Sequence, residues 1–225
     1  MTGASLPGSG RRGAAPSGGG AYTPGVGDGH RERIGIFGGT FDPPHLGHVA
    51  IALEVRHILR LDRVLLMVAN DPWQKTGQRS VTPAPIRAAM THAAVAGCEG
   101  LDVSEIELDR SGPTYTAETL EDLRAAEPDA DLFLIVGSDA AAGLDSWNRP
   151  HDVRDLATTV VVDRGGRQGG RPPDAWPHVV VDVPALEISS SDLRRRVAEG
   201  EPIRGLVAGG VADLIEAQGL YREVA

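Results

Sequence analysis

The sequence contains a single cysteine, Cys98, among its 225 residues. An intrachain disulfide is therefore excluded, and a metal site built on thiolates is not expected. Positive charge is also in short supply, since 31 acidic side chains outnumber 22 lysines and arginines and the formal net charge is -9. A broad electrostatic attraction to nucleic acid is not expected at this charge, although a single cleft can still be positive.

Long apolar runs are missing as well. The densest one, Val64 to Ala69, is far shorter than the roughly 20 residues that a membrane-spanning helix needs, so no membrane association is expected. The Arg11–Arg12 pair is followed by Gly-, Pro- and Ser-rich sequence without an apolar segment, so we expect no twin-arginine export signal. Together with the single cysteine, these absences predict a cytoplasmic protein.

Large apolar side chains are scarce at the start of the chain. Residues 1–31 are rich in Gly, Pro and Ser and cannot bury enough apolar surface to offset the entropy of ordering, so they are predicted to form a disordered tail. Residues 32–225 are long enough for one domain with a full core. The sequence does not specify an oligomeric state, and a homo-oligomer stays open.

From Arg33 onward, apolar β-rich segments alternate with segments of helical periodicity. The predicted strands are 33–37, 63–69, 101–108, 130–137 and two short ones within 158–166 and 178–184. The predicted helices are 48–60, 84–97, 117–126, 190–199 and 208–218. In the first helix, Ile51, Val55 and Ile58 recur at helical spacing and are expected to face the core.

This alternation predicts an α/β protein with a Rossmann-like, doubly wound parallel sheet. A single domain is expected, closed by two C-terminal helices. In such sheets, ligands bind at the carboxyl ends of the strands, so these ends are where a site is sought.

The segment GIFGGTFDPPHLGH, residues 35–48, follows the first predicted strand. Gly38 and Gly39 are expected to allow a sharp turn and the close approach of a ligand. The two prolines stiffen the loop and favour a helix that starts near His45. His45 and His48 then share one face of the first turn, with His48 directed toward the strand ends. A helix N-terminus beside two imidazoles suits a polyphosphate.

Two other interpretations of this segment stay open on the residues alone. It could be a Gly-rich turn with incidental histidines, or His45 and His48 could bind a metal together with Asp42. The segment is not a dinucleotide fingerprint, because G-x-G-x-x-G is absent. A Rossmann dehydrogenase is therefore not favoured.

A second polar segment, ISSSDLRRR, begins a later predicted helix at Ile188. Ser189 and Asp192 fit the S-x-x-D capping pattern, which by itself predicts an ordinary capped helix. The alternative is a second phosphate site, formed by serine hydroxyls, backbone N–H groups and Arg194.

The segment GGTFDPPHLGH closely resembles the G-G-[ST]-F-D-P-x-H-x-G-H signature of nucleotidyltransferases with an H-x-G-H motif. Within that superfamily the chain resembles the bacterial nicotinate-nucleotide adenylyltransferases, from about Arg33 to Tyr221. The resemblance implies transfer of AMP from ATP to nicotinate mononucleotide, which gives nicotinate adenine dinucleotide and pyrophosphate in NAD biosynthesis. It also implies Mg²⁺ carried with ATP and no metal site of the protein's own.

The resemblance assigns site residues position by position. The implied catalytic residues are His45, His48 and Arg194. The implied ATP-binding residues are Gly38, Gly39, Thr40, Phe41, His45, His48, Gly137, Asp139, Ile188, Ser189, Ser190 and Arg194. The implied mononucleotide-binding residues are Trp73, Lys75, Thr114, Tyr115, Thr116, Trp147 and Arg164.

Some of these assignments carry a specific role. The T-Y-T segment at Thr114–Thr116 resembles a site whose backbone groups read the substituent of the pyridine ring, and both threonines are also candidate helix caps. Trp147 is the implied stacking partner of the nicotinate ring, with core packing as the alternative. Asp139 is the implied partner of sugar hydroxyls, and Arg164 that of the mononucleotide phosphate.

The chain departs from the family pattern at several positions. Ser138 replaces the usual alanine and Gly165 a proline, while VAND before the P-W-Q-K loop departs from the usual V-P and leaves that loop's contacts open. In the last segment, Ala208 and Leu214 replace proline and tyrosine. This segment is expected to be structural.

The implied reaction needs no general base, because the attacking phosphate oxygen is already anionic at neutral pH. Catalysis is expected to rest on positioning and electrostatics, with the histidines, serines and Arg194 supplying hydrogen-bond donors and positive charge. Three alternatives remain. One is a phosphopantetheine adenylyltransferase, which usually has threonine at the position of His45. The others are an enzyme that prefers nicotinamide mononucleotide and a non-catalytic nucleotide sensor.

Overall fold

The computed structural model describes residues 30–70, 81–110, 112–165, 169–174 and 176–222. The chain divides into two units, Met1–His30 and Arg31–Ala225, and the second unit contains the helices and strands. The predicted disordered tail lies almost entirely outside the described residues, so that expectation stays a prediction.

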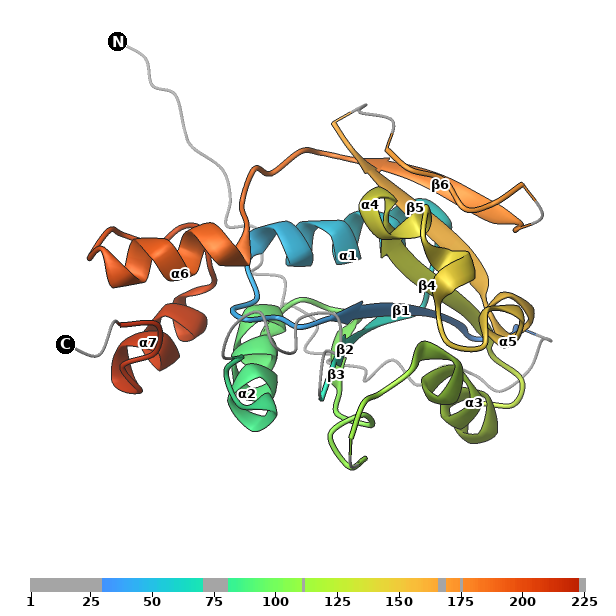
Figure 1. Ribbon diagram of the computed structural model, residues 1–225, viewed down its shortest axis with the longest axis horizontal. Helices are drawn as coiled ribbons and strands as arrows, with labels where there is room; N and C mark the ends of the chain where they lie inside the picture. The colour runs from blue at the N-terminus through green and yellow to red at the C-terminus, as the bar shows by residue number, and fades with distance from the viewer. Residues whose placement is uncertain (1–29, 71–80, 111, 166–168, 175, 223–225) are drawn as a thin grey trace, which may run out of the picture. The chain divides into compact units, whose positions relative to one another are not determined.

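Six strands form one parallel sheet (Figure 1). They are β1 Arg33–Gly39, β2 Arg63–Val68, β3 Leu101–Ser104, β4 Asp131–Gly137, β5 Thr158–Arg164 and β6 His178–Val183. The order across the sheet is β3-β2-β1-β4-β5-β6, with every neighbouring pair parallel. The chain therefore reverses its winding between β1 and β4, the place where doubly wound sheets bind ligands. The predicted fold class is confirmed.

Seven helices and one 3-10 turn accompany the sheet within the described residues. They are α1 Leu46–Leu59, α2 Ala84–Val95, α3 Thr116–Ala126, α4 Ser138–Ala141, η1 Leu144–Ser146, α5 Pro150–Leu156, α6 Ser190–Ala198 and α7 Gly209–Ala217. The elements α4, η1 and α5 are absent from the sequence prediction because each is too short to show an apolar period. The strand predicted to reach residue 108 ends at Ser104, and a turn begins soon after this residue.

Each face of the sheet has its own apolar core, because successive side chains of a strand point to opposite faces. Val64 and Leu66 of β2 pack with residues of α1 and α2. Leu65 and Met67 of the same strand pack with residues of α3 and α5. Figure 1 shows α1 and α3 on opposite sides of the sheet, as a doubly wound fold requires.

The buried face of α1 differs in one position from the prediction. Ile51 and Val55 are buried, whereas Ile58 is 47% exposed. Arg60 turns the chain in the left-handed conformation, and the N–H of Leu61 donates back to the carbonyl of Arg56. In such a helix end, the residue after the turn packs under the last turn, and Leu61, 4% exposed, takes the core position in place of Ile58.

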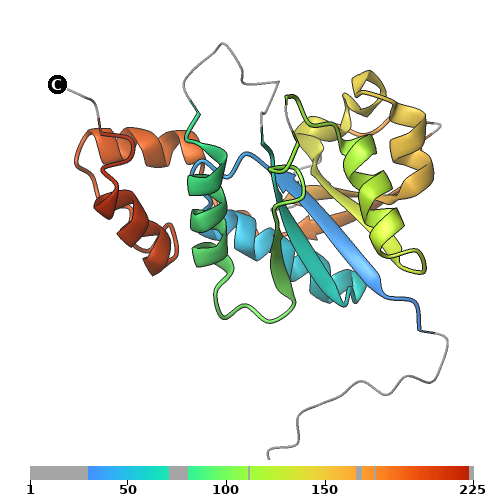
Figure 2. The same ribbon diagram turned by 90° about the horizontal axis from the view of Figure 1, so that it is seen from below.

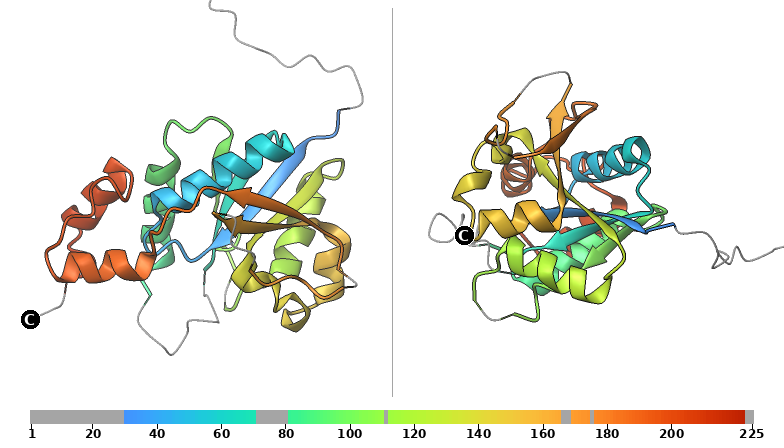
Figure 3. Two further views of the ribbon diagram at one scale, coloured as in Figure 1. Left: turned by 90° about the horizontal axis from the view of Figure 1, so that it is seen from above. Right: turned by 90° about the vertical axis from the view of Figure 1, so that its right-hand side faces the viewer.

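The C-terminal elements return to the start of α1. α6 and α7 lie together, and α7 packs against α2 (Figure 2). α1 lies against β6 (Figure 3), and the segment after β6 passes the first turn of α1 on its way to α6. No helix among the described residues has the length and apolar character to cross a membrane.

Candidate active site

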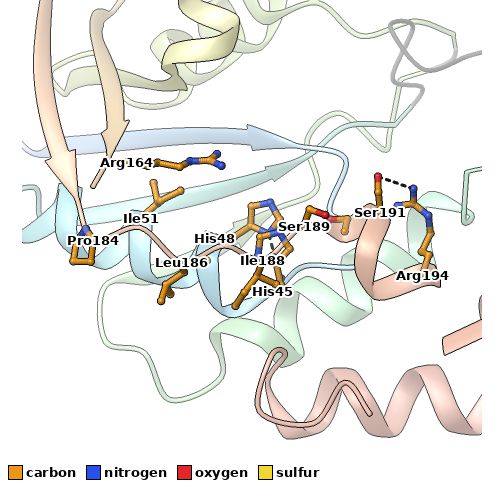
Figure 4. Close-up of a pocket in the computed structure, with 12 residues that line it drawn as sticks. His45, His48, Ile51, Arg164, Pro184, Leu186, Ile188, Ser189, Ser191 and Arg194 are labelled. Atoms are coloured by element: carbon orange, nitrogen blue, oxygen red, sulfur yellow. Dashed lines mark hydrogen bonds between the residues drawn. The ribbon is translucent and has the colours of Figure 1, made fainter. Parts of the chain in front are cut away.

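A cavity of about 470 Å³ opens where the start of α1, the end of β5 and the start of α6 meet (Figure 4). It is named the α1–α6 cavity. In Figure 4, Arg164 and Arg194 lie on opposite sides of the two histidines. None of the described residues that line it carries a carboxylate. Its lining consists of His45, Gly47, His48, Ile51, Arg164, Pro184, Leu186, Ile188, Ser189, Ser190, Ser191 and Arg194.

His48 is held in one orientation by its neighbours. Its ring stacks on that of His45 with centroids 3.7 Å apart and meets the ring of Phe41 edge-on at 5.1 Å. The backbone N–H of His45 donates to Nδ1 of His48 at 3.1 Å. Because Nδ1 accepts this bond, the ring hydrogen of His48 lies on Nε2. His48 therefore acts as a hydrogen-bond donor through Nε2.

His45 differs from His48 in its electrostatics. Its side chain is buried, and Nδ1 has no hydrogen-bond partner among the described residues. Burial, followed by the nearby Arg164 guanidinium, lowers the pKa of His45 to about 4. His45 is therefore uncharged at neutral pH in the absence of a bound anion. It contributes a neutral ring.

The first turn of α1 explains the glycine in H-x-G-H. A Cβ at position 47 would stand 3.0 Å from Nδ1 of His45, so glycine leaves room for that ring to fold back over the helix. The N–H of Leu46, in the same turn, donates to the carbonyl of Leu206 at 3.0 Å. This N–H group is therefore not available to a ligand. Fewer N–H groups at the α1 N-terminus can bind an anion than the sequence predicts.

The start of α6 forms the opposite wall of the cavity. Ser189 is the N-cap, and its Oγ accepts from the N–H of Asp192 at 3.1 Å, which confirms the predicted capping pattern. A serine oxygen that accepts still has its own O–H to donate. The helix end thus presents backbone N–H groups and a hydroxyl toward the cavity.

Two α6 side chains also hold the loop before α1. Ser190 Oγ donates to the carbonyl of Pro43 at 2.8 Å. Arg194 donates to the carbonyl of Asp42 at 2.7 Å and, through its second terminal nitrogen, to Ser191 Oγ at 3.2 Å. The same residues that line the cavity therefore fix the position of the histidine loop.

A second cavity, of about 270 Å³, lies over the carboxyl ends of β1 and β4 and beside the start of α3. It is named the β1–β4 cavity. It brings together four of the residues predicted to bind the mononucleotide and four of those predicted to bind ATP. These are Thr114, Tyr115, Thr116 and Trp147 with Gly38, Gly39, Thr40 and Gly137.

Arg164 lies apart from the other residues assigned to the mononucleotide. It lines the α1–α6 cavity, and its terminal nitrogen is 3.8 Å from where a Cβ would stand on Gly137, which lines the β1–β4 cavity. Arg164 thus stands between the two cavities. Trp147 lines the β1–β4 cavity while it also packs partly against the core, so its two proposed roles are compatible.

The remaining predicted residues have other positions. Asp139 is exposed on α4 and lines neither cavity. Phe41 is 2% exposed. Its ring contacts the ring of His48, and it lines neither cavity. Trp73 and Lys75 lie outside the described residues.

The turn predicted at Gly38–Gly39 occurs two residues later. Both glycines belong to β1, and the chain turns at Phe41, which has a φ of 49°. A Cβ on Gly39 would stand 2.7 Å from the Phe41 ring, so glycine is needed there for packing. A Cβ on Gly38 would meet nothing within 4 Å, which leaves this position open toward a ligand.

Glu107 is a residue of the site that sequence reasoning missed. It is 8% exposed and lines the β1–β4 cavity. Its carboxylate accepts from Thr114 Oγ1 at 2.6 Å and from Thr119 Oγ1 at 2.8 Å. The N-cap of α3 is Tyr115, without a side-chain cap bond, so the prediction that Thr114 and Thr116 cap this helix is wrong. Thr114 donates to Glu107 because a charged carboxylate forms a stronger hydrogen bond than a neutral acceptor does.

Arg87 is a second missed residue. It is 1% exposed and donates to four backbone carbonyls that lie after β1, after β2 and before α2. The only signal in the sequence was an arginine on the apolar side of a predicted helix. The acceptors are Thr40 at 2.8 Å, Ala69 at 2.7 Å, Asn70 at 2.9 Å and Thr82 at 2.7 Å.

Comparison with known proteins supports the family resemblance that the sequence motifs indicate. Residues 36–196 match the model of the cytidylyltransferase-like family. A probable nicotinate-nucleotide adenylyltransferase of Acidothermus cellulolyticus is 42% identical over 203 residues, which cover 86% of this chain and 96% of the relative. A protein of the same name from Streptomyces coelicolor is 45% identical over 188 residues, which cover 82% of this chain and 98% of the relative.

Solved structures show the same fold at lower identity. The Plasmodium falciparum nicotinic acid mononucleotide adenylyltransferase complexed with NaAD has a TM-score of 0.69 and 18% identity, and the match covers 85% of this chain and 98% of that one. The sheet order and the H-x-G-H histidines in the α1–α6 cavity are consistent with the identity to these relatives over most of their length. This chain belongs to the nicotinate-nucleotide adenylyltransferases, within the cytidylyltransferase-like family.

Proposed function

We propose that the protein transfers AMP from MgATP to nicotinate mononucleotide, giving nicotinate adenine dinucleotide and pyrophosphate, a step of NAD biosynthesis in the cytoplasm. The observation that carries the proposal is the α1–α6 cavity, where Arg164 and Arg194 flank the histidines and no described lining residue is acidic. Such a cavity suits a polyphosphate. The names of the relatives support the choice of acceptor.

The triphosphate is placed in the α1–α6 cavity. His48 Nε2–H, the Arg194 guanidinium and the N–H groups at the start of α6 are its proposed donors. A helix N-terminus favours an anion through its free N–H groups and its dipole. His45 contributes as a neutral ring, since its pKa of about 4 leaves it uncharged before ATP arrives.

The nicotinate mononucleotide is placed in the β1–β4 cavity. Trp147 offers a face on which the pyridine ring can stack. The start of α3, at Tyr115 and Thr116, lines the same cavity, and its positive dipole end favours the carboxylate of nicotinate over the neutral amide of nicotinamide. Arg164, between the cavities, is the proposed partner of the phosphate at their junction.

The chemical step is an in-line displacement. An oxygen of the mononucleotide phosphate forms a bond to the α-phosphorus of ATP while the bond from that phosphorus to the bridging oxygen breaks, and pyrophosphate leaves with the electron pair. The attacking oxygen is already anionic, so no residue removes a proton. The donors around the α1–α6 cavity stabilise charge on the α-phosphate and the leaving group, each contributing about 3 kcal/mol in the transition state.

Mg²⁺ is proposed to arrive with ATP as part of the substrate. The described residues contain no cluster of three side chains able to hold a metal ion, which does not fit a cage built by the protein. Mg²⁺ commonly keeps several waters and binds through substrate phosphates. The donor set of the cavity fits that mode, in which the protein contacts the phosphates.

Pyrophosphate release tests the proposal. The full chain is incubated with MgATP and, separately, with nicotinate mononucleotide, nicotinamide mononucleotide or phosphopantetheine. Fastest release is expected with the nicotinate compound. A preference for either other acceptor would contradict the proposed substrate, and no release with any of the three would favour a nucleotide sensor.

A further inference from the structure

The loop between β1 and α1 is tied to the C-terminal part of the chain. Ser190 and Arg194 hold its carbonyl groups, and the N–H of Leu46 donates to Leu206. A further tie comes from Tyr221, whose hydroxyl donates to Oδ1 of Asp42 at 2.7 Å across 179 positions of sequence. Tyr221 lines neither cavity and has no role in the mechanism above.

Asp42 connects Tyr221 with the cavity. It is 1% exposed and stands three residues before His45. Its carboxylate accepts from Tyr221, and its carbonyl accepts from Arg194. Burial is the main reason that the pKa of Tyr221 is raised, so the phenol keeps its hydrogen and remains a donor.

The loop depends on such contacts because it has no regular structure. Residues 40–45 belong to neither strand nor helix, so no ladder of backbone bonds fixes them. Phe41 within the loop has a positive φ of 49°, a conformation that neighbouring structure must maintain. Displacements of about 1 Å can cost 100-fold in rate when reacting groups must be aligned.

We propose that Tyr221 is a positioning residue for adenylyl transfer, which acts through Asp42 to set Arg194 and His45 against the triphosphate. This inference rests on the proposed function. It assigns to the end of the chain a part in catalysis that the sequence pattern leaves as purely structural.

Tyr221→Phe tests the inference, because it keeps the ring and its packing and removes only the hydroxyl. We expect kcat with MgATP and nicotinate mononucleotide to fall about 10-fold, with both KM values within about twofold of wild type because Tyr221 touches neither substrate. The matched control is Thr159→Val, which removes the partner of Trp176 Nε1, a buried bond of 2.7 Å at the far end of β5. This control should lose stability without a loss of kcat.

A double-mutant cycle with Asp42→Asn adds a second criterion. Both single changes weaken the same hydrogen bond, so the double variant should lose little more kcat than the worse single variant. Unchanged kcat in Tyr221→Phe, or losses that multiply in the double variant, would overturn the inference. So would a drop in kcat that Thr159→Val reproduces at equal loss of stability.

A readout without turnover separates this inference from the proposed function. In nitrogen NMR of the histidine side chains of the full chain without substrate, Tyr221→Phe should shift His45 and His48 and leave the exposed His57 unchanged. If all histidine signals match the wild type, the positioning role fails. If wild type turns over no acceptor while the signals shift, the proposed function fails and the link from Tyr221 to the histidines stands.

Discussion

At the scale of single residues, the two histidines of one motif lie in different surroundings, and different roles are proposed for them for that reason. His48 accepts from the backbone at Nδ1 and presents Nε2–H, whereas His45 is buried beside Arg164 and stays neutral. The motif predicts where both rings lie. It does not predict the neutral state of His45, which follows from burial and then from Arg164, a residue 119 positions later in the sequence.

Replacement of His48 tests the electrostatic role. His48→Ala should lower kcat at least about 100-fold, since one donor to the developing charge is lost, and leave the far-ultraviolet circular dichroism unchanged. His57→Ala, on the exposed side of the same helix, is the matched control and should retain full activity. Near-normal turnover of His48→Ala would refute the assignment.

The neutrality of His45 predicts a pH dependence of stability. Its pKa is about 4 in the folded chain against 6.5 for an unperturbed histidine. The unfolded chain therefore binds the proton first, and stabilisation that is full above pH 6.5 is lost as the pH falls toward 4. The loss should reach up to about 3 kcal/mol.

Urea unfolding at several pH values measures this loss, with His45→Asn compared to wild type. The variant should show a smaller decrease of the unfolding free energy between pH 6.5 and 4. Parallel pH profiles for the two proteins would contradict the neutral state of His45.

At the scale of elements, Arg87 joins the ends of β1 and β2 to the start of α2. A lysine lacks the planar fork of a guanidinium and cannot donate to all four carbonyl groups. Arg87→Lys should cost about 3 kcal/mol in urea unfolding and raise KM for the mononucleotide, because Thr40 and Ala69 line the β1–β4 cavity.

Arg124→Lys is the matched control for Arg87→Lys. Arg124 also donates to backbone carbonyls, those of Pro128, Ala130 and Leu156, but none of these lines either cavity. The control should lose stability with unchanged KM. An unchanged KM in Arg87→Lys would show that its carbonyl contacts serve stability alone.

Glu107 holds the start of α3 in place by accepting hydrogen bonds from Thr114 and Thr119. Thr114 and Thr119 donate to separate oxygens of the carboxylate, and Glu107→Gln turns one of these oxygens into an NH2 donor, so both hydrogen bonds cannot be kept as they are. KM for nicotinate mononucleotide should rise about 5-fold, the effect of one hydrogen bond of about 1 kcal/mol, with KM for ATP unchanged. Glu105→Gln, an exposed change in the same turn, serves as control, and equal KM values in both variants would contradict the role of Glu107.

At the scale of the whole molecule, the sequence predicts the parallel sheet and most of its elements because buried strands and long helices have strong periods. It does not predict how the residues are distributed between the cavities. Gly38 and Gly137 join Trp147, while Arg164 joins the histidines, because these groupings follow from the order β3-β2-β1-β4-β5-β6. The partners of buried polar residues such as Arg87 and Glu107 cannot be predicted from the local sequence, since they are backbone and hydroxyl groups of other segments.

The triphosphate and the mononucleotide are proposed to occupy the two cavities and to meet at Arg164. The most direct measurement is a crystal structure of the full chain with nicotinate mononucleotide and an ATP analogue that cannot be cleaved between the α- and β-phosphates. Phosphates are expected within hydrogen-bond reach of His48 Nε2 and Arg194, and the nicotinate ring is expected against Trp147. A triphosphate in the β1–β4 cavity, or a nicotinate ring away from Trp147, would contradict this placement.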